Sequence, residues 1–228
     1  MNKHEILKAF ELSAAAYKDI QPFYPYTCTN MLNNTKLSVE CFLRRQNDVL
    51  RITFRGTDTP ENWKNDFKFW EKTIPCFDGN CKIKVHAGFL NSYKSAGIRG
   101  KILNAIDDEV KFIKISGHSL GAALGILCAF DVAKHFPDRN LEVVVFGCPR
   151  VGNRNFAKLY NQTVSKSIRV ENGNDIVTKV PFPLLNPFFN YRHVGSKLHI
   201  GKKKLPFWFS AKDHRPTSYY SALLKYFL

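Results

Sequence analysis

Five consecutive residues, Gly117-His118-Ser119-Leu120-Gly121, form the Gly-x-Ser-x-Gly pattern that is typical of a nucleophilic serine. An apolar stretch at 112–116 precedes the pattern, and a helical run at 122–136 follows it. A sharp turn from strand to helix exposes the serine hydroxyl, and the two glycines keep side chains out of that turn. The first N–H groups of the helix also favour a developing oxyanion. We predict that Ser119 is a nucleophile, against the alternative of a turn that only joins a strand to a helix.

A nucleophilic serine needs a general base, and the base needs an acid that orients it. In one widespread order the acid follows the serine and the histidine comes last. Two acids lie on or just after the nucleophile helix, one begins a strand at the wrong end, and one adjoins a histidine; these are Asp131, Asp138, Glu142 and Asp213. Glu171 and Asp175 remain. Asp175 is favoured because it lies in the turn after the carboxyl end of a strand, and a turn-capping aspartate is the alternative.

Four histidines follow the serine. His135 lies more than four helical turns from Ser119 and is interpreted as a helix cap. His193 and His199 fall on predicted strands, where a structural imidazole is the simpler interpretation. His214 precedes the last helix in a loop that can reach back over the sheet edge, so it is the predicted base, with His193 as its competitor.

These residues need a scaffold, and the hydrophobic periodicity predicts one of alternating strands and helices. The strands are predicted at 37–45, 49–54, 112–116, 141–146, 167–170, 190–194 and 197–200, and the helices at 4–17, 87–107, 122–136, 155–161 and 218–227. A polar turn is expected at 171–175. This order predicts an α/β fold with a mostly parallel central sheet and helices on both faces. Reactive groups gather at the carboxyl ends of strands in such a sheet.

The 228 residues contain no linker or internal repeat, so we expect a single domain over 1–228. The chain has 34 Lys and Arg against 19 Asp and Glu, a formal net charge of +15. This excess favours an anionic partner, and an acidic lipid surface, a polyanionic substrate and nucleic acid are the candidates. Lys202, Lys203 and Lys204 could contribute at an anionic membrane, whereas a merely solvated basic surface is the alternative.

The first ten residues include Glu5 and Lys8, which interrupt the apolar core that a secretory signal needs. No apolar run is long enough for a transmembrane helix. We therefore expect an intracellular protein with peripheral membrane association, or an export signal outside these residues. Cys128 and Cys148 are expected to be buried, while Cys76 with Cys81, and Cys28 with Cys41, are candidate disulfides in an oxidising compartment. No cysteine and histidine spacing resembles a zinc site, so no metal is expected.

Several further motifs follow one another in a fixed order. They are Thr53-Phe54-Arg55-Gly56-Thr57, Asn62-Trp63, Val85-His86-Ala87-Gly88-Phe89-Leu90-Asn91-Ser92-Tyr93, Phe146-Gly147-Cys148-Pro149-Arg150-Val151-Gly152, Asn174-Asp175-Ile176-Val177, Tyr191-Arg192-His193-Val194-Gly195 and Asp213-His214. Together with the serine pattern they resemble the fungal-type, class 3 lipase family of α/β-hydrolases. The resemblance covers most of the chain from about Val49 onward.

The resemblance implies Ser119 as nucleophile, Asp175 as acid and His214 as base, with no cofactor. It implies an oxyanion hole made by Thr57 and by the N–H of Leu120. It also aligns residues 58–70 with a short helical lid, in which Trp63 and Phe67 are candidate lid or substrate contacts; a fixed surface helix is the alternative. The family commonly has prolines where this chain has Ile176 and Thr178, so the geometry of that loop needs its own explanation.

We therefore expect a serine ester hydrolase that acts on acylglycerols or other lipid esters through an acyl-enzyme. The substrates left open are phospholipids, in a phospholipase A-type reaction, and short-chain or feruloyl esters. Apolar side chains from Phe182 to Phe189 suggest an acyl-binding wall, and core packing would explain them as well. A non-catalytic basic membrane-binding protein is the alternative from another class. No nucleic-acid partner is expected, and the oligomeric state stays open.

Overall fold

The computed structural model describes residues 1–16, 28–34, 39–56, 71–73, 83–181, 190–202 and 208–227. The strands are β1 Cys28–Asn34, β2 Val39–Gln46, β3 Val49–Phe54, β4 Glu71–Thr73, β5 Lys84–His86, β6 Phe112–His118, β7 Asn140–Phe146, β8 Gly152–Asn153, β9 Ser167–Asn172, β10 Tyr191–Arg192 and β11 Ser196–Ile200. The helices are α1 Lys3–Ala15, α3 Ala87–Lys94, α4 Ile98–Asn104, α5 Leu120–His135, α6 Arg154–Thr163 and α7 Pro216–Phe227, with short 3₁₀ turns η3 Ser95–Gly97 and η4 Val177–Lys179.

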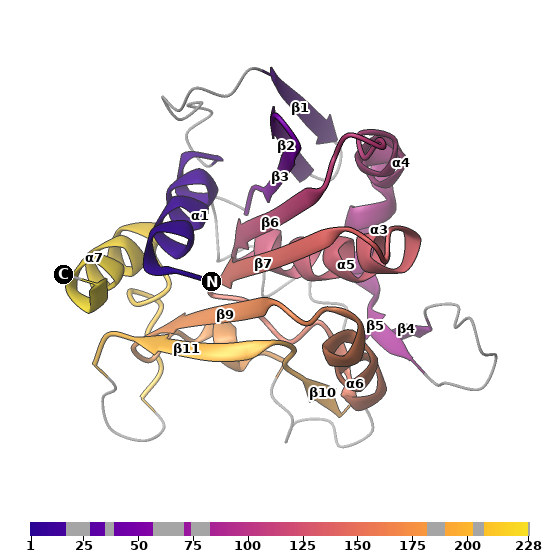
Figure 1. The fold of residues 1–228 in the computed structure, drawn as a ribbon. Coiled ribbons are helices and arrows are strands. Elements are labelled where there is room, and N and C mark those ends of the chain that lie inside the picture. The colour runs from indigo at the N-terminus through magenta and orange to yellow at the C-terminus, as the bar shows by residue number, and fades with distance from the viewer. Residues whose placement is uncertain are drawn as a thin grey trace.

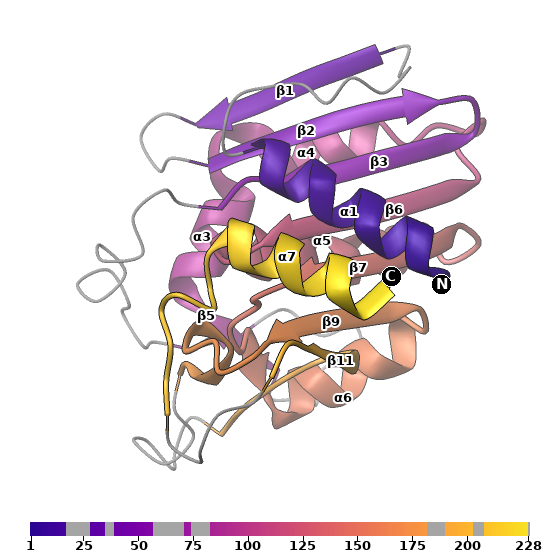
Figure 2. The same ribbon diagram turned by 90° about the vertical axis from the view of Figure 1, so that its left-hand side faces the viewer.

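A seven-stranded sheet carries the fold, in the order β1-β2-β3-β6-β7-β9-β11. The five strands from β3 to β11 run parallel, and β1 and β2 are antiparallel to their neighbours. Helices α1 and α7 lie side by side across one face, while α3, α4, α5 and α6 lie on the other (Figures 1 and 2). The predicted α/β-hydrolase architecture, a mostly parallel sheet with helices on both faces, is confirmed.

Each face of the sheet has its own apolar core. The larger core packs α3 to α6 against the sheet, and α5 contributes a continuous buried run from Gly121 to Phe130. The smaller core packs α1 and α7 against β7, β9 and β11, with Phe10, Phe146 and Tyr219 at its centre. Since α7 is anchored by this second core, the loop that leads into α7 is held over the carboxyl ends of the strands.

A charged row crosses the sheet beneath α1. Arg51, Lys114 and Glu142 are neighbours in register on β3, β6 and β7. Glu5 of α1 meets this row, with Lys114 Nζ at 2.8 Å and Arg51 Nη1 at 3.3 Å from its carboxylate. Burial acts to raise the pKa of Glu5, but the hydrogen bonds from Lys114 and Arg51 outweigh it and hold the pKa at about 2. Ion pairing therefore adds to apolar packing in docking α1.

Three predictions of secondary structure need correction. The helix predicted at 87–107 is broken, because Gly97 adopts left-handed backbone with φ 71° between α3 and α4. The predicted strand at 190–194 is only β10, at the edge of a separate four-stranded sheet ordered β10-β8-β5-β4. The turn expected at 171–175 starts later, since β9 continues to Asn172.

The cysteines behave as small hydrophobes where the structure describes them. Cys41, Cys128 and Cys148 are buried free thiols, as expected for the last two. The candidate disulfide between Cys28 and Cys41 is wrong, because the antiparallel register sets Cys28 opposite Arg45 and Cys41 opposite Leu32. Cys76 and Cys81 lie outside the described residues. Among the helices that the structure describes, none is both long and apolar enough to cross a membrane.

Candidate active site

Ser119 occupies a strained turn between β6, which ends at His118, and α5, which begins at Leu120. Its backbone has φ 64° and ψ −125°, a conformation that non-glycine residues rarely adopt. The Ser119 N–H donates to the carbonyl of Phe146 at 2.9 Å, which ties the turn to the end of the neighbouring strand β7. The predicted elbow is therefore present, and it lies at the carboxyl edge of the parallel strands.

The glycines on each side of the serine are required by close backbone contacts. A Cβ on Gly117 would lie 2.4 Å from the carbonyl oxygen of Gly121, and a Cβ on Gly121 would lie 2.3 Å from that of Phe54. Both distances are far below van der Waals contact and involve backbone that cannot move aside cheaply. The turn can therefore form only with glycine at both positions.

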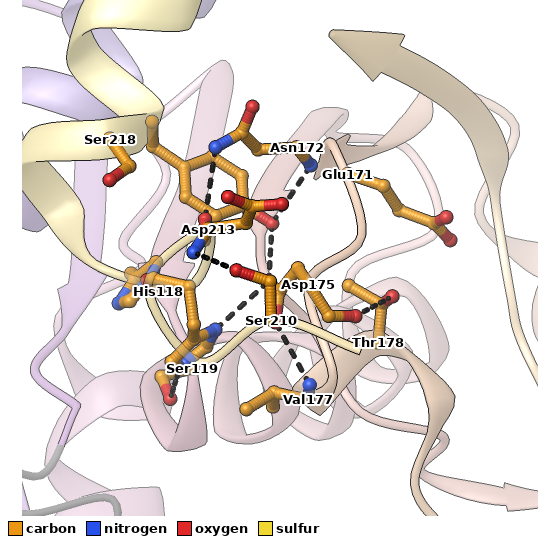
Figure 3. Close-up of polar contacts among 12 residues, drawn as sticks. His118, Ser119, Glu171, Asn172, Asp175, Val177, Thr178, Ser210, Asp213 and Ser218 are labelled. Atoms are coloured by element: carbon orange, nitrogen blue, oxygen red, sulfur yellow. Dashed lines mark hydrogen bonds and ion pairs between the residues drawn. The ribbon is translucent and has the colours of Figure 1, made fainter. Parts of the chain in front are cut away.

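A continuous hydrogen-bond chain joins the serine to a histidine and an acid from two other loops. Ser119 Oγ lies 2.6 Å from His214 Nε2, and His214 Nδ1 lies 2.9 Å from Asp175 Oδ2. The three residues are almost fully buried, with 2%, 4% and 1% of their surfaces exposed. Figure 3 shows Ser119 and Asp175 within this network. An ionised carboxylate only accepts hydrogen bonds, so Nδ1 carries a proton and Nε2 is left to accept from the serine.

The acid is fixed by donors on both of its oxygens. The Val177 N–H donates to Asp175 Oδ1 at 2.8 Å, and the Tyr219 hydroxyl donates to Oδ2 at 2.6 Å. The Thr178 hydroxyl donates to the Asp175 carbonyl at 2.8 Å (Figure 3). A side chain that turns back on its own backbone holds such a loop without proline. This explains how Ile176 and Thr178 can replace the prolines common in the family.

Tyr219 was missed by sequence analysis. It is fully buried on the first turn of α7, and its hydroxyl accepts from the Asn172 N–H at 3.2 Å while donating to Asp175. Burial, followed by the nearby Asp175 carboxylate, raises the pKa of Tyr219 well above its ordinary value, so the hydroxyl keeps its proton. The available signal was the pair Tyr219 and Leu223, which forms a buried stripe at helical spacing.

His118 and Gly147 complete the surroundings of His214. The His118 ring lies 4.6 Å from the His214 ring, and its Nε2 donates to the His214 carbonyl at 2.9 Å. Burial and the neighbouring imidazole lower the pKa of His118 well below its ordinary value, so this ring is neutral. A Cβ on Gly147 would lie 2.8 Å from His214 Cε1 and 3.0 Å from Asp175 Oδ2. Glycine at this strand end leaves room for the base and the acid.

The competing residues have structural partners of their own. Glu171 pairs with Arg169 beside it on β9 and with Lys179 at 3.4 Å. His193 Nε2 contacts the Thr178 carbonyl at 2.8 Å, and burial together with Arg169 lowers its pKa to about 2. His135 bonds to Asp131 within α5. None of these side chains is brought to Ser119.

One of the two residues predicted to form the oxyanion hole, Leu120, lies within the described part of the chain. Leu120 is the first residue of α5, where N–H groups have no acceptor within the helix. Thr57, the lid segment 58–70 with Trp63 and Phe67, and the apolar run 182–189 all lie outside the described residues. The predicted roles of these residues, and that of Leu120, stay predictions.

Curated proteins with related sequences are lipid esterases by name. A chloroplastic phospholipase A(1) of Arabidopsis thaliana is 34% identical over 57% of this chain and 33% of its own length. A secreted mono- and diacylglycerol lipase of Fusarium solani is 31% identical over 70% of this chain and 46% of its own. The chain therefore spans less than half the length of these two relatives.

Solved lipases share the fold. The structure of a fungal lipase–inhibitor complex is 25% identical, covers 94% of both chains and superposes with a TM-score of 0.75. The family model described as lipase (class 3) matches residues 51–185, more than half of the chain and including Ser119 and Asp175. The chain belongs to the class 3 lipase family.

Proposed function

We propose that this protein is a serine hydrolase that cleaves carboxylic esters of lipids through an acyl-enzyme, acting as one domain over residues 1–228. The observation that carries the proposal is the buried chain from Ser119 Oγ to His214 and on to Asp175, with links of 2.6 and 2.9 Å. The 2.6 Å link is short enough for the histidine to take the proton of the serine hydroxyl, and the 2.9 Å link orients the histidine.

The reaction begins when His214 Nε2 takes the Ser119 proton and Oγ attacks the ester carbonyl. The N–H of Leu120 stabilises the resulting oxyanion, together with the backbone and hydroxyl of Thr57 that the family resemblance implies. His214 then protonates the leaving alcohol, and water hydrolyses the acyl-enzyme by the same route. Asp175 holds the imidazole tautomer throughout and stabilises the imidazolium that forms.

A glycerolipid is the proposed ester. The names of the Arabidopsis and Fusarium relatives, a phospholipase A(1) and a mono- and diacylglycerol lipase, support this class of substrate. The net charge of +15 favours an anionic lipid surface, and hence a phospholipid, as the setting of the reaction. We propose that the enzyme associates peripherally with such a surface and that 58–70, with Trp63 and Phe67, covers the site in water.

A panel of lipid esters tests this proposal. Release of fatty acid would be measured from a diacylglycerol, from phosphatidylcholine, from phosphatidylglycerol and from a soluble short-chain ester. The wild-type protein should hydrolyse at least one long-chain glycerolipid, and Ser119→Ala should lower the rate by several orders of magnitude. Activity confined to the short-chain ester would contradict a lipid substrate. Lipid binding without hydrolysis would favour a non-catalytic membrane-binding protein.

A further inference from the structure

Two exposed aromatic residues lie on the segment that precedes His214, and the backbone of this segment contacts the loop that carries Asp175. Trp208 is 56% exposed and Phe209 is 45% exposed, although most of the large apolar side chains that the structure describes are buried. Three cations with exposed side chains, Lys202, Lys212 and Arg215, flank them in the sequence. These five residues are called the aromatic-basic rim below.

Hydrogen bonds join the segment of Trp208 and Phe209 to the loop that carries Asp175. Asn174 Nδ2 donates to the Trp208 carbonyl at 2.6 Å, and the Ser210 N–H donates to the Asn174 carbonyl at 3.0 Å. The Ile176 N–H in turn donates to the Ser210 carbonyl at 3.4 Å. Lys202 joins from the other side, since its carbonyl lies 3.4 Å from the position of a Cβ on Gly173. The rim therefore lies at the carboxyl edge of the sheet, the same edge as Ser119.

The rim is positively charged, and residues 208–215 contain a single acidic residue that could neutralise it. The acid between Lys212 and Arg215 is Asp213, whose carboxylate accepts from the Asn174 N–H at 2.8 Å. That carboxylate is therefore turned toward the protein. Apolar rings next to cations match the boundary of an anionic bilayer, where rings enter the headgroup region and cations meet lipid phosphates.

We propose that the aromatic-basic rim docks the protein on an anionic phospholipid surface and thereby brings the edge of the sheet that carries Ser119 to the lipid. The inference rests on the proposed function only in taking that lipid as the source of substrate. Docking does not depend on catalysis, because the five side chains of the rim are not among those that form the hydrogen-bond chain at Ser119.

Vesicle flotation tests the proposal on the full chain carrying Ser119→Ala, so that the lipid is not consumed. The vesicles would be phosphatidylcholine alone, or phosphatidylcholine and phosphatidylglycerol in equal parts. Binding should require the anionic lipid. Trp208→Ser with Phe209→Ser should weaken it at least about tenfold, because two half-exposed rings lose their burial in the interface. Lys202→Gln with Lys212→Gln should weaken it roughly 25-fold, as two cations are each worth about fivefold there.

Matched variants at the opposite edge of the sheet distinguish binding through the rim from binding that depends only on the net charge of the protein. Phe112, 40% exposed, begins β6 at that edge, and Lys111 and Lys166 immediately precede β6 and β9. Phe112→Ser, and Lys111→Gln with Lys166→Gln, should bind anionic vesicles within about twofold of the parent, since charges beyond a Debye length of about 8 Å are screened. Equal losses at both edges would overturn the proposal.

Activity on a soluble short-chain ester, measured with Ser119 intact, distinguishes failure of docking from failure of the proposed function. The rim variants should keep this activity while losing hydrolysis of lipid in anionic vesicles. Rim variants that bind vesicles like the parent would refute docking even if the enzyme is active. A concentration-dependent dimer that the Trp208 and Phe209 changes abolish would assign the rim to contacts between copies of the chain and would also overturn the proposal.

Discussion

Tyr219 is the residue whose removal tests the geometry of the acid most sharply. Tyr219→Phe keeps the ring, which packs edge-on against His118 and Phe146, and deletes only the hydroxyl. Two buried hydrogen bonds are lost, one to Asp175 Oδ2 at 2.6 Å and one from the Asn172 N–H at 3.2 Å. A hydrogen bond to a charged group is worth about 1.5–3 kcal/mol, and a buried N–H left without an acceptor costs about 1–3 kcal/mol. Taken together, these two contributions predict that the free energy of unfolding falls by about 2.5–6 kcal/mol.

Catalysis should fall less than it would on loss of the acid. In the variant, Asp175 keeps the Val177 N–H on Oδ1 and the His214 Nδ1 donor on Oδ2. Loss of an orienting carboxylate costs about 10⁴-fold in kcat in serine enzymes of this type, and a carboxylate that is only less well fixed should cost about tenfold. The loss should appear in kcat with KM nearly unchanged, because the hydroxyl faces the acid and not the substrate.

The assay is steady-state hydrolysis of a soluble ester, together with urea unfolding of the same preparations. Tyr220→Phe is the matched control, because this neighbouring hydroxyl is on an exposed residue and lies 3.5 Å from Glu11. It should change neither stability nor kcat beyond experimental error. A Tyr219→Phe variant with wild-type kcat and stability would refute the role assigned to the hydroxyl. A change confined to KM would refute positioning of the acid.

Three further predictions concern Gly147, His86 and Arg150. Gly147→Ala should lower kcat/KM at least about 100-fold, because φ is 57° and the new Cβ would displace the His214 ring; activity assays on protein with a native circular dichroism spectrum check this. Burial lowers the pKa of His86 to about 4. Between about pH 6.5 and pH 4 the folded state therefore binds fewer protons than the unfolded chain. The free energy of unfolding should fall on acidification across this window by up to about 1.4 kcal/mol per pH unit. His86→Asn keeps an acceptor for the Gly88 N–H and should flatten the fall in denaturation midpoint with pH; an unchanged slope would contradict this origin. Arg150→Gln should destabilise the segment after Asp175, because the guanidinium donates to the carbonyls of Lys179 and Pro181, and faster proteolysis near Lys179 would reveal it.

Local sequence patterns predicted much of this fold, because most of its helices and strands show the hydrophobic periodicity of their type. The central strands β6 and β7 and the helix α5 appear within a few residues of their predicted bounds. The exceptions depend on tertiary structure. Helices α3 and α4 share one apolar pattern, and only the left-handed backbone of Gly97 separates them. The short strands β4, β5, β8 and β10 form a sheet from distant segments, which no local window contains.

The Gly-x-Ser-x-Gly pattern predicted Ser119, and elimination along the chain favoured Asp175 and His214; in the structure His214 is hydrogen-bonded to both of the others. The supporting residues could not be selected in this way. In the sequence, Tyr219 is an aromatic residue on the apolar side of an amphipathic helix. Its hydroxyl meets the Asp175 carboxylate only when α7 packs beside the loop of Asp175. The sequence gives no sign that Gly147 differs from an ordinary turn glycine, because its closeness to the His214 ring appears only in the folded structure.

The most direct test of the central claim is labelling by a fluorophosphonate, which reacts with a serine only when a base activates it. Wild-type protein should take up one equivalent of label, mapped by mass spectrometry to Ser119, with loss of ester hydrolysis in proportion. Ser119→Ala should take up none, and Asp175→Asn should react far more slowly. Label on another residue, or full hydrolysis by Ser119→Ala, would contradict the account.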